Sequence, residues 1–122
     1  MFFNPSQVRV FIYSNPIDMR RGFERLSCYI REDLGEDLLA GQFFLFLGKN
    51  RRRLKVLYYD GTGLILVTKR LEEGIFMSVH ELSDVHEITS GEMALIFSGN
   101  RIRYSLATRG KQKNVVHIDK ED

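Results

Sequence analysis

The residues of this sequence best suited to chemistry are basic side chains gathered in one short stretch. Five of the seven residues from Lys49 to Lys55 are basic, namely Lys49, Arg51, Arg52, Arg53 and Lys55. Guanidinium and ammonium groups bind phosphate oxygens, and several of them in a row can follow a nucleic-acid backbone. The spacing therefore predicts a phosphate-binding hairpin. The alternative is a hairpin whose charges serve only to keep the protein soluble. Because side chains alternate along a strand, we expect Arg51, Arg53 and Lys55 on one face and Arg52 on the other.

Charge is segregated along the chain, although the formal net charge is only +2. Residues 49–70 carry seven bases and one acid, residues 71–92 carry six acids and no Lys or Arg, and residues 93–114 carry five bases and no acid. Such segments either neutralise each other in the fold or present a basic pole to a polyanion and an acidic pole to a basic protein. For the second case, we expect Glu72, Glu73 and Glu81 to contact the basic partner.

No set of residues in the sequence matches a known kind of catalytic or metal site. His80, His86 and His117 together with Cys28 lack the spacing of zinc ligands. The segment Asp60-Gly61-Thr62-Gly63 lacks both the alternating carboxylates of a calcium loop and the Lys of a phosphate-binding loop. The sequence therefore predicts a protein that is not an enzyme and that needs no metal or cofactor.

Hydrophobic spacing predicts the elements that hold the basic stretch in place. Strands are expected at Val8–Tyr13, Phe43–Leu47, Leu54–Tyr59, Leu64–Lys69 and Ile75–Val79. A helix capped by Asn15, with Pro16 at its first position, is expected to bury the stripe Met19, Phe23, Leu26, Ile30 and Leu34. A shorter helix is expected between Thr89 or Ser90 and Gly99, with Ser90 as its cap and Met93, Ile96 and Phe97 facing inward.

These elements predict an α+β fold, with a mostly antiparallel sheet of four or five strands packed on one side by the helix Met19–Leu34 and a short second helix near the C-terminus. The 122 residues suit a single domain, which we expect to span residues 1–107 and to precede a disordered polar tail over residues 108–122. The single cysteine fits a reducing compartment. With no signal peptide and no apolar run of about 20 residues, we expect a cytoplasmic protein without membrane contact.

Three blocks of the sequence, in order, resemble one known family. They are Pro16–Leu26 (PIDMRRGFERL), Phe44–Gly63 (which contains FLF, KNR and LKVLYYDGTG) and Lys69–Phe76 (KRLEEGIF). These blocks are similar to signatures of the accessory TnpB, or Orf2-like, protein of the sixty-six family of bacterial insertion sequences. The resemblance extends over roughly Val8 to Phe97.

The resemblance implies a non-catalytic accessory protein of transposition, encoded beside a separate and larger transposase. One hypothesis is non-specific binding of double-stranded DNA through the basic hairpin. The basic residues assigned to this interface are Lys49, Arg51, Arg52, Arg53, Lys55, Arg20, Arg21, Lys69 and Arg70. The other hypothesis is an adaptor that docks its acidic segment onto the transposase through Glu72, Glu73 and Glu81.

Overall fold

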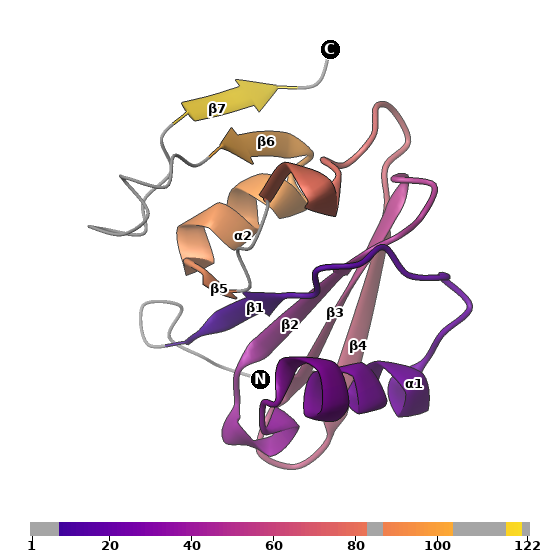
Figure 1. The fold of residues 1–122 in the computed structure, drawn as a ribbon, viewed down its shortest axis with the longest axis vertical. Helices are drawn as coiled ribbons and strands as arrows, with labels where there is room; N and C mark the ends of the chain where they lie inside the picture. The colour runs from indigo at the N-terminus through magenta and orange to yellow at the C-terminus, as the bar shows by residue number, and fades with distance from the viewer. Residues whose placement is uncertain (1–7, 83–86, 104–116, 121–122) are drawn as a thin grey trace.

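The computed structural model describes residues 8–82, 87–103 and 117–120, with the side chains of 101–103 and 117–120 left aside. In chain order the elements are β1 (Val10–Ile12), α1 (Phe23–Cys28), η2 (Tyr29–Leu34), η3 (Leu38–Ala40), β2 (Phe43–Leu47), β3 (Arg53–Tyr59), β4 (Leu64–Arg70), η4 (Val79–Leu82), β5 (Glu87–Ile88), α2 (Ser90–Phe97), β6 (Asn100–Arg103) and β7 (His117–Lys120) (Figure 1). The helix α1 continues directly into the wider, π-helical turns of η2.

Five of the strands form one mixed sheet in the order β4-β3-β2-β1-β5. Within this sheet, β1 and β2 pair in parallel, and the chain between them carries α1. The other three pairs are antiparallel. The predicted α+β class, with a mostly antiparallel sheet and two helices, is therefore confirmed.

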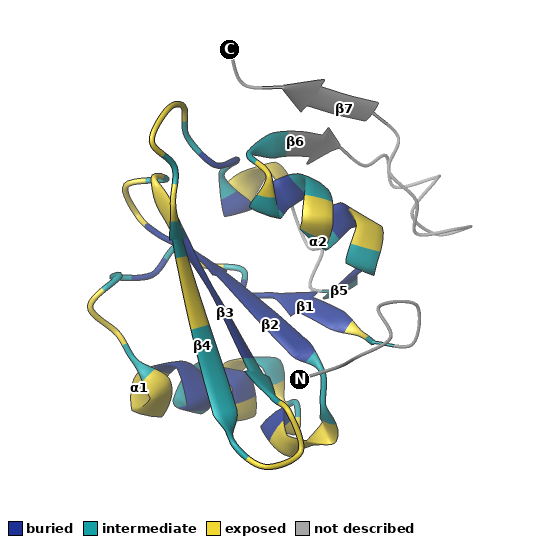
Figure 2. Cartoon of the chain, turned by 180° about the vertical axis from the view of Figure 1, so that it is seen from behind, coloured by how far each residue is buried: buried dark blue, intermediate teal, exposed yellow. Residues whose placement is uncertain are grey.

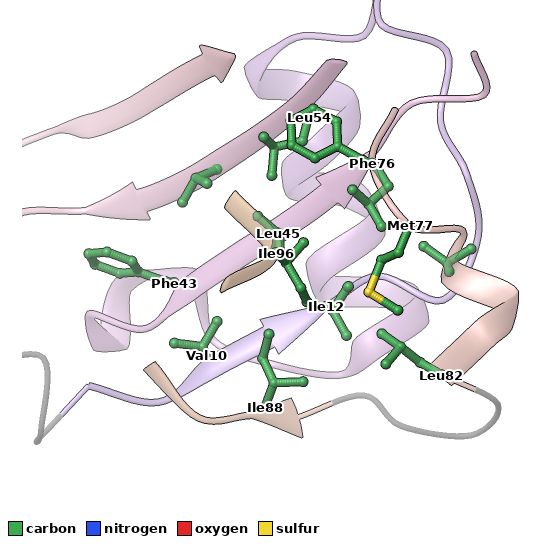
Figure 3. Packing of buried hydrophobic residues seen from close by; sticks show 13 residues of the cluster. Val10, Ile12, Phe43, Leu45, Leu54, Phe76, Met77, Leu82, Ile88 and Ile96 are labelled. Atoms are coloured by element: carbon green, nitrogen blue, oxygen red, sulfur yellow. The ribbon is translucent and has the colours of Figure 1, made fainter. Parts of the chain in front are cut away.

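The two helices lie on opposite sides of the sheet, so each packs against one face of it (Figure 1), while the edge strand β4 stays partly exposed. The apolar run of β2 is buried along its whole length, and its side chains alternate between the two faces. Phe44 and Phe46 belong to the core under α1, with Leu26 and Ile30 of the helix. The core on the other face is shown in Figure 3, and its buried members are Val10, Ile12, Phe43, Leu45, Leu47, Leu54, Val56, Phe76, Met77, Val79, Leu82, Ile88 and Ile96.

The expected start of the first helix is wrong by about two turns. The helix begins at Phe23, because the preceding segment makes backbone hydrogen bonds to the sheet in place of helical ones: Ile17 N donates to Leu47 O at 2.9 Å, and Lys49 N donates to Ile17 O at 3.0 Å. The Asp18 carboxylate also accepts the backbone N–H of Arg20, a turn geometry that competes with a helix.

The predicted apolar stripe is partly confirmed. Leu26 and Ile30 are fully buried, and Met19 and Leu34 are partly buried against the same core. Phe23 is 45% exposed, so its expected burial is wrong.

Two further predictions can be compared with the structure. The segment Ile75–Val79 is not a strand, and the fifth strand of the sheet is Glu87–Ile88. Thr89 rather than Ser90 caps α2, in a capping box with Glu92. The disordered tail expected over residues 108–122 stays a prediction: 108–116 and 121–122 lie outside the described residues, and 117–120 are described as β7, paired with β6. Within the described ranges, no helix has the length and apolar character needed to cross a membrane.

Candidate nucleic-acid interface

The basic hairpin predicted between the second and third strands is present, and close backbone packing determines its shape. A Cβ atom at Gly48 would lie 3.0 Å from the carbonyl oxygen of Arg53 and 3.0 Å from the Cγ of Met19, so a side chain here would require these neighbours to shift. Arg51 adopts the left-handed backbone conformation, with φ of 63°. The side chain of Asn50 accepts the backbone N–H of Arg52 at 3.0 Å, which closes the turn.

The side chain of Arg51 is half-buried and lies against the segment from Phe76 to Glu81. Its Nε donates to the carbonyl oxygen of Phe76 at 2.9 Å, and its Nη2 lies 3.4 Å from a carboxylate oxygen of Glu81. The N–H of Phe76 donates in turn to the carbonyl of Arg51. The expectation that Arg51 shares a face with Arg53 and Lys55 is wrong, since β3 begins only at Arg53 and strand alternation does not extend back into the turn.

Lys55 is buried, with only 8% of its surface exposed. Its Nζ donates to the carbonyl oxygen of Arg21 at 2.6 Å and so holds the segment before α1 against the sheet. Burial lowers the pKa of Lys55, the nearby charge of Arg53 lowers it further, and Asp18 opposes both effects. Lys55 thus contacts the protein's own backbone rather than solvent.

Three more of the predicted basic residues also contact groups of their own chain. Arg52 donates to the carbonyl oxygens of Leu71 and Glu72 at 3.1 and 3.2 Å. Arg70 pairs with the Glu72 carboxylate at 3.1 Å on an exposed surface. Lys69 donates to the carbonyl of Phe97 at 2.7 Å, at the end of α2, where unpaired carbonyls favour a cation.

Two of the predicted hairpin cations, Lys49 and Arg53, are exposed and lie in one groove with Arg20. The groove has a volume of about 320 Å³, and its remaining lining residues are Ile17, Asp18, Met19 and Asn50. It forms because the parallel contact between Ile17 and Gly48 brings the segment before α1 alongside the hairpin.

Arg20 is held at this groove by Asp18. Two nitrogens of the guanidinium contact the Asp18 carboxylate, the closest pair at 2.6 Å, yet 90% of the Arg20 side chain remains exposed. The same hydrogen bonds hold the pKa of Asp18 well below its usual range. Because a guanidinium carries five N–H groups, Arg20 keeps donors for a second anion.

A second hollow of about 610 Å³ adjoins the groove and shares Arg20 with it. Its lining residues are Arg20, Arg21, Gly22, Phe23, Glu24, Arg25 and Cys28. In Figure 2 the first turn of α1 is coloured as exposed, in agreement with the exposure of Phe23, Glu24 and Arg25. Phe23 and Arg25 were not among the predicted site residues, because the apolar spacing placed Phe23 in the core.

The acidic residues assigned to partner docking fall into two groups. Glu72 and Glu73 are exposed in the turn after β4. Glu81 accepts the backbone N–H of Ser78 at 3.0 Å and contacts Arg51, so it has a role within the fold.

Among the residues that the structure describes, no three His, Cys, Asp or Glu side chains converge as metal ligands would. A hydrogen bond to Glu32 raises the pKa of the Cys28 thiol, which disfavours the thiolate that a nucleophile needs.

Comparison with known proteins agrees with the resemblance found in the sequence. The profile of the family described as IS66 Orf2-like protein matches residues 8–106. Two relatives from Sinorhizobium fredii, the uncharacterized proteins y4jC and y4hO, are 33% and 36% identical to this chain over 92 residues. The matched residues cover 75% of this chain, 79% of y4jC and 80% of y4hO. No solved structure matches the chain significantly. The chain therefore belongs to the IS66 Orf2-like (TnpB) family of insertion-sequence accessory proteins.

Proposed function

We propose that the protein acts in transposition by binding the phosphate backbone of double-stranded DNA. The observation that carries the proposal is the groove in which Arg20, Lys49 and Arg53 lie together and remain exposed. The other hairpin cations contribute less, since Arg51 and Lys55 are engaged by backbone carbonyls of their own chain.

The charge balance of the groove favours an anion. Three cations line it, and the single acid, Asp18, already contacts Arg20. Phosphate contacts of this kind position a protein on DNA without reading its sequence. With three phosphates neutralised, the logarithm of the affinity is expected to fall against the logarithm of the salt concentration with a slope of about −2.7.

The test is a titration of labelled duplex DNA by fluorescence anisotropy at several salt concentrations. Replacing Lys49 and Arg53 together by Ala removes two of the three cations, so the slope is expected to become shallower by roughly two units. The matched control replaces Arg9 and Arg31, which are exposed, lie outside the groove and remove the same charge.

Two results would count against the proposal. If both double variants weaken binding equally, overall charge rather than the groove is responsible. If the unaltered protein does not bind duplex DNA at low salt, DNA binding is not its function.

The exposed pair Glu72 and Glu73 supports a second proposal, in which the protein docks onto a basic surface of its transposase. Glu72→Gln with Glu73→Gln is then expected to abolish capture of the transposase by the purified protein. Glu81 is unsuitable for this test, because its carboxylate also accepts the backbone N–H of Ser78 within the fold, whereas the ion pair of Glu72 with Arg70 lies on an exposed surface.

A further inference from the structure

Phe23 is an aromatic side chain exposed among cations. Of the described residues, the large hydrophobic side chains with substantial exposure are Phe23, Leu39 and Val67, and Phe23 is the aromatic one. It lines the hollow of about 610 Å³ together with Arg20, Arg21 and Arg25, and Glu24 is the single acid there.

Backbone contacts on both sides of Phe23 fix its position at the hollow. The buried Nζ of Lys55 fixes the carbonyl of Arg21, two residues earlier in the chain. The N–H of Leu26 donates to the carbonyl of Gly22 at 3.0 Å, and the Leu26 side chain is fully buried under the sheet. Phe23 therefore lies between two fixed residues, Arg21 and Leu26, and the exposed part of its ring can contact a ligand.

An aromatic ring beside several guanidinium groups matches the chemistry of unpaired nucleotides. The guanidinium groups contact phosphates, while the ring stacks on a base, and stacking tolerates any base sequence. In a duplex the faces of the bases are covered by their neighbours, so a surface ring finds no base to stack on. Because the hollow shares Arg20 with the groove, one strand can contact both.

We propose that this hollow binds single-stranded DNA with one base stacked on Phe23. The inference rests on the proposed function, which it extends from the phosphate backbone to an unpaired base. Stacking of one base on an aromatic side chain contributes roughly 5- to 150-fold in affinity. Phe23→Ala is therefore expected to weaken binding of a single-stranded oligonucleotide by about that factor and to leave duplex binding nearly unchanged.

The absence of tryptophan from the chain allows a direct test of stacking. Phe23→Trp places a single indole in the hollow, and its fluorescence is expected to be quenched when single-stranded oligothymidine binds. The matched control is Leu39→Trp, at an exposed position outside the hollow, where no quenching is expected. Circular dichroism of each variant shows whether it keeps the fold.

The outcomes separate this inference from the proposed function. If the indole at position 23 is not quenched, or if Phe23→Ala lowers single-strand and duplex affinity by the same factor, the stacking site is refuted. Duplex binding that still depends on Lys49 and Arg53 would then leave the proposed function intact. If neither form of DNA binds to the unaltered protein at low salt, both proposals fail.

Discussion

The contrast between Phe23 and Leu26 predicts how much each side chain contributes to stability. For a fully buried Phe, replacement by Ala would cost about 3–5 kcal/mol. In the structure Phe23 is 45% exposed. About half of a ring area of roughly 200 Å² is thus covered, which at about 25 cal/mol per Å² gives about 2.5 kcal/mol as an upper limit. Ala keeps part of this contact and has a higher helix propensity, so we expect a loss of about 1–1.5 kcal/mol.

Leu26 is fully buried between α1 and the sheet, so Leu26→Ala leaves a cavity and is expected to cost about 2–5 kcal/mol. Chemical denaturation of both variants, followed by circular dichroism, compares their free energies of unfolding with that of the unaltered protein. The reasoning is refuted if Phe23→Ala destabilises the protein as much as Leu26→Ala does. That result would mean that the ring packs in the core as the apolar spacing predicted.

Three other substitutions test particular contacts. Burial and a hydrogen bond to Asp33 raise the pKa of Tyr13 from 10.0 to about 12. The stability that the protonated Tyr13 contributes is therefore present below pH 10 and is lost as the pH rises toward 12. The midpoint of thermal unfolding between about pH 10 and 12 is expected to depend less on pH in the variant Tyr13→Phe. Thr89→Ala removes the cap of α2 and is expected to lower the free energy of unfolding by about 1 kcal/mol in a denaturant titration, whereas Thr89→Ser should restore most of it. Gly48→Ala places a Cβ against the carbonyl of Arg53 and is expected to lower the free energy of unfolding by about 1–3 kcal/mol. An unchanged free energy of unfolding would refute the close approach.

The strands were largely predictable because their sequence pattern is local. The uninterrupted apolar run Phe43–Leu47 indicates a central strand, and the structure buries it on both faces. The turn at Asp60 to Gly63 joins two strands that pair over their full length, as its composition predicts.

The start of α1 was not predictable, because long-range contacts determine it. Pro16 and Asp18 have the residue types of a first helical turn, but Ile17 pairs with the hairpin more than 30 residues later in the chain. A hydrogen bond to a distant backbone group leaves no trace in local spacing. The same pairing moves Phe23 from the expected core to the first exposed turn of the helix.

The basic hairpin shows why a count of charges overestimates a binding surface. In the sequence, Arg51, Arg53 and Lys55 are equivalent members of one cluster. In the fold, Arg51 holds the hairpin to the segment around Phe76, and Lys55 holds the segment before α1. Each donates a hydrogen bond to a backbone carbonyl of the chain, so these two side chains stabilise the fold that carries the exposed cations.

This division of roles has a consequence for any mutational scan of the protein. If the groove binds DNA as proposed, loss of an exposed cation such as Lys49 is expected to remove one phosphate contact and to change the salt dependence of binding. Loss of Lys55 is expected to release the carbonyl of Arg21 and to displace its neighbours Arg20 and Phe23 together. A weakened affinity therefore identifies a DNA contact only when the salt slope changes with it and the fold is retained. By that criterion we expect duplex contacts at Arg20, Lys49 and Arg53, whereas substitutions of Arg51 and Lys55 are expected to act through the fold.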